Sequence, residues 1–161
     1  MLLSTKHITD FLNKRFVTDA QRTKIDDSEK VVFNDYIPGV TADPSTTATS
    51  SGTAPTIAEM TKTFTPGNAS NRIEVVFDGT FENDDKKESV FCGIFIDGTL
   101  EAETVREGYP KDADEKATLA THWRGSLSAA SHTIDVRMWA SDETVTATGI
   151  RRALSVKETG T

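Results

Sequence analysis

The feature that most constrains the fold is a two-residue alternation of apolar and polar side chains, which runs through residues 57–161. Successive side chains of a strand point to opposite faces, so this alternation predicts strands with one buried and one solvated face. It is clearest in residues 72–82, where the apolar face carries Ile73, Val75, Phe77 and Phe81. In residues 132–139 the side chains predicted to point inward are Ile134, Val136 and Met138. The pattern predicts an all-β region.

Turn signals separate these strands at the spacing of a β-sandwich. Residues 89–96 are apolar on both faces, which predicts a central strand covered on both sides. Asp97-Gly98 follows directly and is a strong hairpin signal. An opening strand near residues 58–64 and a closing pattern over residues 144–156, broken at Gly149, complete the series. We therefore expect an antiparallel, jelly-roll-like β-sandwich of about eight strands.

Composition agrees with strands and excludes several classes of function. Thr supplies 24 of the 161 residues, and its branched side chain fits a pleated sheet. Residues 56–161 carry 12 basic and 18 acidic side chains, so this part should repel a phosphate backbone, and we expect no nucleic-acid partner. A single cysteine, Cys92, excludes an internal disulfide. The longest apolar run, residues 90–96, is too short to span a bilayer, so we expect no membrane insertion.

An arm of a different character precedes the alternating region. Residues 1–40 begin with apolar side chains at helical spacing and continue with a capping-box sequence at residues 18–21, which predicts short helices. Isolated helices of fewer than about 12–15 residues are marginal in water, so this arm needs a partner surface. We expect it to serve as an N-terminal anchoring and oligomerisation arm. The apolar residues expected to contact the partner are Phe11, Leu12, Phe16, Ile25 and Phe33.

Residues 41–56 consist almost entirely of Ser, Thr, Ala, Pro and Gly. Such a stretch buries too little apolar surface to offset the entropy lost on ordering. We interpret it as a flexible linker, and the alternative is an extended strap that becomes ordered against a partner subunit. The expected organisation is therefore an arm (1–40), a linker (41–56) and a β-sandwich domain (57–161).

No motif predicts a catalytic or metal centre. His7, His122 and His132 have no second His or Cys at ligand spacing, and the acidic turns at residues 83–85, 112–115 and 142–143 lack the EF-hand pattern. A Ser-His-Asp set assembles in space, so spacing does not exclude one, but the chain has no G-x-S-x-G nucleophile elbow. We expect no enzyme activity, no cofactor and no metal.

Trp139 is the best candidate for an exposed aromatic contact, because it is predicted on the face opposite Ile134 and Val136. Three roles suit such a ring: filling a subunit interface, packing within the chain, or stacking on a sugar. We favour the interface. Trp123 and Tyr109 are further candidates for an interface or glycan contact.

Two stretches resemble proteins of tailed bacteriophages. Residues 16–25, FVTDAQRTKI, resemble the (F)VTDAE(R)xKL segments of phage fibre-like and appendage proteins. Residues 125–137, GSLSAASHTIDVR, are similar to a corner that precedes an alternating strand in small sandwich domains of phage virion proteins, with Ala130 where such corners often carry Gly. The resemblance implies a trimeric appendage that is anchored by its N-terminal region and displays a C-terminal β domain.

We therefore expect a non-enzymatic phage virion structural protein, namely a head decoration (cement) or short head-fibre protein. It would be made in the host cytoplasm and lie on the surface of the capsid or tail. The expected partners are its own copies, as a homotrimer, and the major capsid or tail protein. The alternative is a tail-fibre or adaptor-type appendage that binds a host-surface glycan. A carbohydrate-active enzyme would need paired carboxylates about 5–9.5 Å apart on facing strands, whereas most acids here fall in turns or on solvated faces.

Overall fold

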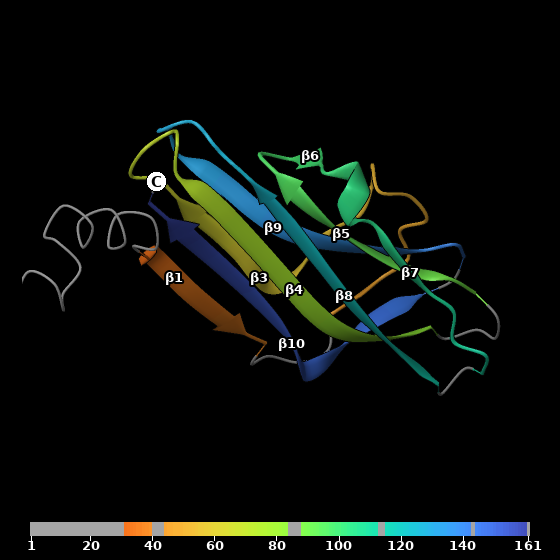
Figure 1. Ribbon diagram of the computed structural model, residues 1–161. Coiled ribbons are helices and arrows are strands. Elements are labelled where there is room, and N and C mark those ends of the chain that lie inside the picture. Colours follow the sequence, from red (N-terminus) through yellow and green to blue (C-terminus); the bar gives the residue numbers. More distant parts are fainter. Residues whose placement is uncertain (1–30, 40–43, 84–87, 113–114, 143, 161) are drawn as a thin grey trace, which may run out of the picture.

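The computed structural model describes residues 31–39, 44–83, 88–112, 115–142 and 144–160, which form two antiparallel sheets packed face to face (Figure 1). Sheet A contains β1 (Val31–Pro38), β2 (Ser45–Thr46), β4 (Arg72–Asn83), β8 (Lys116–Gly125) and β10 (Val145–Thr159). Sheet B contains β3 (Thr56–Phe64), β5 (Val90–Ile96), β6 (Thr99–Leu100), β7 (Arg106–Gly108) and β9 (His132–Ala140). A 3₁₀ helix, η1 (Ala102–Thr104), follows β6. The helices predicted in the arm fall outside the described residues.

The strands are wound as a jelly roll. The order is β1-β10-β4-β8 in sheet A and β3-β9-β5 in sheet B, where β5 also pairs with β6 and β7. The antiparallel pairs are nested along the chain: β1 with β10, β3 with β9, β4 with β8, and β5 with β7. Successive pairs alternate between the two sheets, which is the jelly-roll winding. The predicted jelly-roll-like sandwich is confirmed.

This winding gives the sandwich two distinct poles. At the terminal pole, Val31 of β1 is in register with Thr159 of β10, which is in register with Arg72 of β4. At the loop pole, β4 ends and β8 begins, with Glu82 in register with Lys116. The chain therefore enters and leaves the sandwich at the same pole.

The core lies between the inward faces of the two sheets. The residues predicted to point inward are at most 1% exposed: Ile73, Val75, Phe77, Phe81, Ile134, Val136 and Met138. Burying each such side chain contributes about 1.5–3 kcal/mol. The hairpin predicted at Asp97-Gly98 is also present, because both residues have positive φ (52° and 79°) and Ile96 pairs with Thr99. The strand after this turn, β6, ends at Leu100, and η1 follows it.

The sandwich starts earlier than predicted. β1 lies inside the segment assigned to the arm, yet it pairs with β10 from Val31 to Pro38 and forms an edge of sheet A. The boundary expected at residue 57 is therefore wrong for residues 31–38. A short extended piece cannot be distinguished from a linker by its own sequence, because the strand that pairs with it lies more than a hundred residues later.

Residues 44–56 form an ordered strap and not the flexible linker that composition suggests. β2 pairs with β10, the Ala147 N–H donates to the Pro44 carbonyl at 2.9 Å, and the Ala140 N–H donates to the Ala48 carbonyl at 2.9 Å. Ala54 is buried against sheet B. Backbone hydrogen bonds hold this strap, and they need no large apolar side chain. The strap is ordered against its own sandwich, whereas the alternative expectation invoked a partner subunit.

Two strands carry irregularities in the middle of the sandwich. The register of β10 against β4 shifts between Ala147 and Arg152, where a break at Gly149 was predicted, and β3 shifts against β9 between Thr56 and Thr61. Within the β3 irregularity, Glu59 has a φ of 70°. At each shift one strand advances five residues while its partner advances two, so the pairing is interrupted there and side chains change direction.

Candidate functional site

The two outer faces of the sandwich differ in how they are covered. Three buried residues on the outer side of sheet B, Ala54, Phe95 and Trp139, form a second apolar cluster. Residues from the strap and from the segment around η1 pack against this cluster: Ala48, Leu100 and Val105. The outer face of sheet B is therefore covered by the chain itself.

Trp139 lies in this covered cluster. Its ring stacks on Phe91 with a centroid separation of 5.6 Å and an interplanar angle of 6°, and the residue is 7% exposed. The sequence placed Trp139 on the correct face, opposite Ile134, but the strap that covers it was read as a linker. The structure supports packing within the chain, and the preference for a subunit interface at Trp139 is wrong for the described chain.

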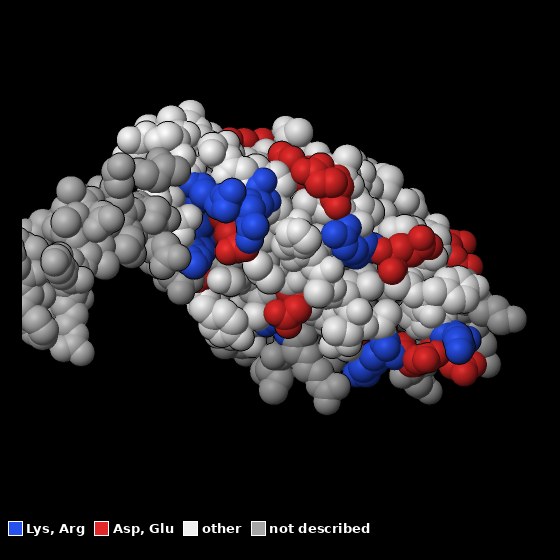
Figure 2. All heavy atoms as spheres, in the orientation of Figure 1, with Lys and Arg blue, Asp and Glu red and all other residues white. Residues whose placement is uncertain are grey.

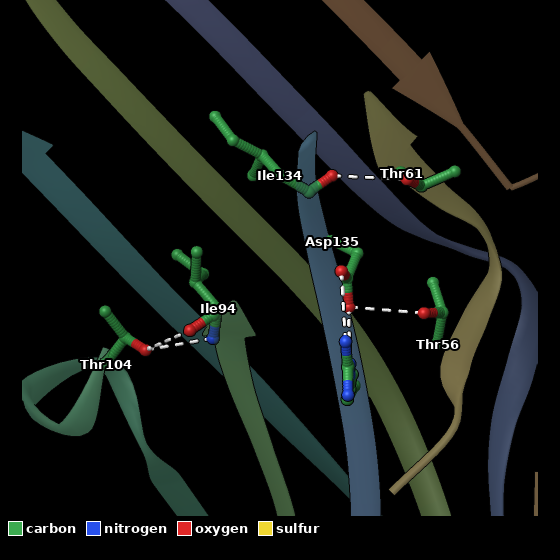
Figure 3. A network of polar contacts seen from close by, with 7 residues as sticks. Thr56, Thr61, Ile94, Thr104, Ile134 and Asp135 are labelled. Carbon is green, nitrogen blue, oxygen red and sulfur yellow. Dashed lines mark hydrogen bonds and ion pairs between the residues drawn. The ribbon is translucent and has the colours of Figure 1, made fainter. Parts of the chain in front are cut away.

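Polar contacts fasten the covering segments to sheet B (Figure 3). The Asp135 carboxylate accepts hydrogen bonds from Thr56 Oγ1 at 3.2 Å and from Arg137 Nε at 2.6 Å. The Ile94 N–H donates to Thr104 Oγ1 at 2.9 Å, which ties η1 to β5. The Arg137 guanidinium also lies 4.2 Å from the centre of the Phe95 ring. These groups are engaged in holding the fold, so this face offers no free polar site among the residues drawn.

The outer face of sheet A carries exposed side chains along its whole width. Tyr36, Ser155, Val76 and His122 are in register across β1, β10, β4 and β8 and form one transverse row. In this row Tyr36 is 66% and Val76 41% exposed, so two large side chains with apolar surface face the solvent. We call this outer surface the open face, and it is the candidate interaction surface of the chain.

A cluster of charges lies on the open face near the terminal pole. Glu74 is in register with Lys157 on one side and Arg124 on the other, and Arg72 precedes it by two residues on the same face of β4. Arg124 donates a hydrogen bond to Glu74. That bond, with the charges of Arg124, Lys157 and Arg72, holds the pKa of the Glu74 carboxyl below its usual value. Figure 2 shows basic side chains gathered around an acidic one at this end of the molecule.

The other sequence-predicted contact residues are scattered. Tyr109 is 55% exposed and follows β7 at the loop pole. Trp123 is half-buried on the inner side of sheet A, where its Nε1 donates to Glu101 Oε2 at 3.1 Å. Phe33 lies in β1, where its backbone is in register with Glu158 of β10. Phe11, Leu12, Phe16 and Ile25 lie outside the described residues. The structure therefore does not bring Trp139, Trp123 and Tyr109 together into one site, and Tyr36 was missed because β1 was not recognised as a strand.

Ser128, His132 and Asp97 form a hydrogen-bonded chain at the terminal pole. His132 Nδ1 lies 2.7 Å from Asp97 Oδ2, and Nε2 lies 2.9 Å from Ser128 Oγ. This connectivity is that of a Ser-His-Asp triad, but Nε2 also lies 3.1 Å from the Ser128 carbonyl oxygen. A carbonyl only accepts, so it favours an N–H at Nε2, whereas a general base needs a lone pair there. We interpret these hydrogen bonds as structural: they connect the loop before β9 to the Asp97-Gly98 turn.

Cys92 is a buried thiol of the core. Cys92 is fully buried, and burial raises the pKa of its thiol to about 12. Within the described ranges, no three His, Cys, Asp or Glu side chains gather closely enough to hold a metal ion. In the same part of the chain, no helix has the length and apolarity needed to cross a lipid bilayer.

Comparison with known proteins supports the fold. No protein-family model matches this chain, and no curated protein sequence is similar to it. A solved structure of the Gt strain of infectious bursal disease virus matches 81% of this chain and 32% of that chain, with a TM-score of 0.52 and 12% identity. The EclA C-terminal domain, a sugar-binding protein, matches 97% of this chain and 99% of that chain, with a TM-score of 0.37 and 15% identity. This chain spans about a third of the viral protein's length, and that similarity shows the sandwich fold.

Proposed function

We propose that this chain is a non-enzymatic structural protein on the surface of a tailed-phage virion, acting as a head decoration (cement) or short head-fibre protein. The observation that carries the proposal is that the sandwich has two different ends, the terminal pole and the loop pole. Residues 1–30, which contain the phage-like segment 16–25, join β1 at the terminal pole, and the exposed Tyr109 lies at the loop pole. An anchored protein needs this separation between its attachment and its displayed end.

Two further features support a particle-surface role. The jelly-roll winding is common among viral capsid domains, and the structural neighbour from infectious bursal disease virus is a protein of a virus. The open face with Tyr36 and Val76 supplies an exposed apolar surface of the kind that subunits bury on assembly. In this proposal the copies assemble as homotrimers and contact the major capsid or tail protein through residues 1–30.

The test is a deletion of residues 1–30 in the full chain, followed by addition to particles that lack the protein. The expected result is a β-rich protein, by circular dichroism, that no longer joins particles and no longer trimerises by light scattering. Deletion of residues 1–40 is unsuitable because it removes β1 and the ion pair between Asp35 and Lys62, at 2.5 Å. A variant without residues 1–30 that still decorates particles would refute the anchoring role.

A receptor-binding appendage is the second candidate, because Tyr36 and Tyr109 are exposed aromatic rings that a sugar could stack on. Trp139 and Trp123 are unsuitable for that role, since the first is buried and the second faces the core. A glycan array with the full chain and with Tyr36→Ala and Tyr109→Ala separates the two functions. Binding that either substitution abolishes would favour the appendage, whereas an empty array with labelling of capsid faces in electron micrographs would favour decoration.

A further inference from the structure

The charge cluster on the open face is a basic patch, which we define as Arg72, Arg124 and Lys157. Glu74 lies among these three cations: it accepts a hydrogen bond from Arg124, is in register with Lys157 and lies two residues from Arg72 on the same face of β4. Three positive charges and one negative charge leave the patch at +2, whereas the whole chain has a net charge of -7. A local surplus of cations on an acidic protein selects for an acidic partner.

An acidic segment is tethered beside this patch. The residues immediately before β1 are Asp26, Asp27, Ser28, Glu29 and Lys30, which contain three acids and one base. Val31 is in register with Thr159 and Thr159 with Arg72, so the segment joins the sandwich two strand spacings from Arg72, or about 10 Å. Five extended residues span up to about 17 Å, so residues 26–29 reach the patch without being stretched.

We propose that residues 26–29 dock on the basic patch of their own chain. Their carboxylates pair with Arg72 and Lys157, which now share Glu74 with Arg124. Each exposed ion pair is weak. Because the segment is tethered to the sandwich, forming these pairs costs no translational entropy of association, and together they favour the docked state at low ionic strength. At 1 M salt the screening length falls to about 3 Å, and the segment is released.

Docking has a consequence for residues 1–25. Docking of residues 26–29 fixes the point from which residues 1–25 extend, close to the terminal pole of the open face. It therefore also sets the direction in which a partner of residues 1–25 lies. This inference goes beyond the proposed function and does not depend on it, because it concerns contacts within one chain.

Limited trypsin digestion of the full chain tests the proposal through the Lys30–Val31 bond, next to the docked segment. The bond after Lys6 is the internal reference. Relative to it, cleavage after Lys30 should accelerate about threefold or more when the patch is neutralised by Arg72→Gln with Lys157→Gln. The same acceleration is expected for Asp26→Asn with Asp27→Asn, and combining the two pairs should add nothing further. Synthetic peptides of residues 16–36 correct for the intrinsic effect of each substitution on trypsin.

A matched control comes from the same sheet. Lys116→Gln removes an exposed cation of β8 at the loop pole, in ion pair with Glu82 at 3.1 Å, and should leave cleavage after Lys30 unchanged. Equal cleavage rates in the wild type and the patch variant would overturn the proposal, as would additive effects of the two pairs. Protection that grows with protein concentration would also overturn it, because the occupant would then be a second copy of the chain.

Discussion

Arg152 and Glu59 form an ion pair between the two sheets, with Nη2 3.5 Å from Oε2. Glu59 lies within the register shift of β3, and Arg152 is the residue at which β10 resumes pairing with β4 after its own shift. The Arg152 side chain is 0% exposed, and its backbone carbonyl accepts a hydrogen bond from the Gly39 N–H at 2.9 Å. The ion pair therefore connects the irregular segments of β3 and β10.

Removing the Glu59 carboxylate should destabilise the protein strongly. Glu59→Gln deletes a negative charge that faces the buried Arg152 guanidinium, and loss of one partner of a buried pair costs about 3–5 kcal/mol in the free energy of unfolding. Urea denaturation measures this cost. Asp78→Asn on the exposed side of β4 is the control and should change stability by less than about 0.5 kcal/mol. A Glu59→Gln variant as stable as this control would contradict the structural role of the pair.

The backbone of Glu59 gives a second prediction at the same position. Its φ of 70° favours glycine over residues with a Cβ. Glu59→Gly and Glu59→Ala both delete the carboxylate, but Gly also relieves the backbone, so it should be less destabilising than Ala by about 1–2 kcal/mol. Equal urea midpoints for the two variants would show that the left-handed conformation carries no strain.

Trp139 should contribute to the free energy of unfolding of the isolated chain. Trp139→Ala removes the ring that stacks on Phe91 and opens the cluster under the strap, which should cost about 3–5 kcal/mol. Tyr109→Ala is the matched aromatic control and should lie within about 0.5 kcal/mol of the wild type, because that ring is exposed. Both values come from chemical denaturation. A near-neutral Trp139→Ala that instead weakens association would restore the interface role.

Stability should fall in acid partly through Asp97. The Thr133 N–H and then His132 lower the pKa of its carboxyl below the ordinary value of 3.8. A lowered pKa stabilises the folded state above the unfolded-state pKa, and that contribution disappears as the pH falls through the folded-state value. The stability difference between wild type and Asp97→Asn should thus be constant at neutral pH and shrink below about pH 4. A difference that stays constant down to pH 2 would contradict this linkage.

Cys92 should report unfolding. Its thiol is fully buried and its pKa is raised to about 12, so almost no thiolate is present or accessible at neutral pH. We expect a thiol reagent such as Ellman's reagent to leave the native protein unmodified and to react with one thiol per chain in urea. The reaction should follow the loss of β-structure measured by circular dichroism. Rapid labelling without denaturant would show that β5 opens locally.

The sequence predicted those parts of the fold that depend on local patterns. The inward faces of β4 and β9 follow from strict alternation, and the turn after β5 follows from Asp97-Gly98, which suits left-handed backbone. The break expected at Gly149 falls within the register shift of β10 between Ala147 and Arg152.

The remaining features depend on distant partners. The strap is held by backbone hydrogen bonds such as that from the Ala140 N–H to the Ala48 carbonyl. Side-chain composition does not predict such bonds, because every residue except proline has the same backbone groups. β1 is defined by its pairing with β10. The open face could not be located for the same reason: its row combines Tyr36, Val76 and His122 from three strands that only the jelly-roll winding places in register.

The position of β10 determines when the protein can fold during synthesis. Among the described strands, β10 is the last to leave the ribosome, yet in sheet A it lies between β1, the first of them, and β4. Until it emerges, these two strands have no neighbour between them and present unpaired backbone edges, which are prone to pair with other chains. Sheet A must therefore close after translation of β10, through contacts that are among the most distant in the chain. Folding of this kind is slow, so we expect the nascent chain to be most vulnerable to aggregation just before β10 is synthesised.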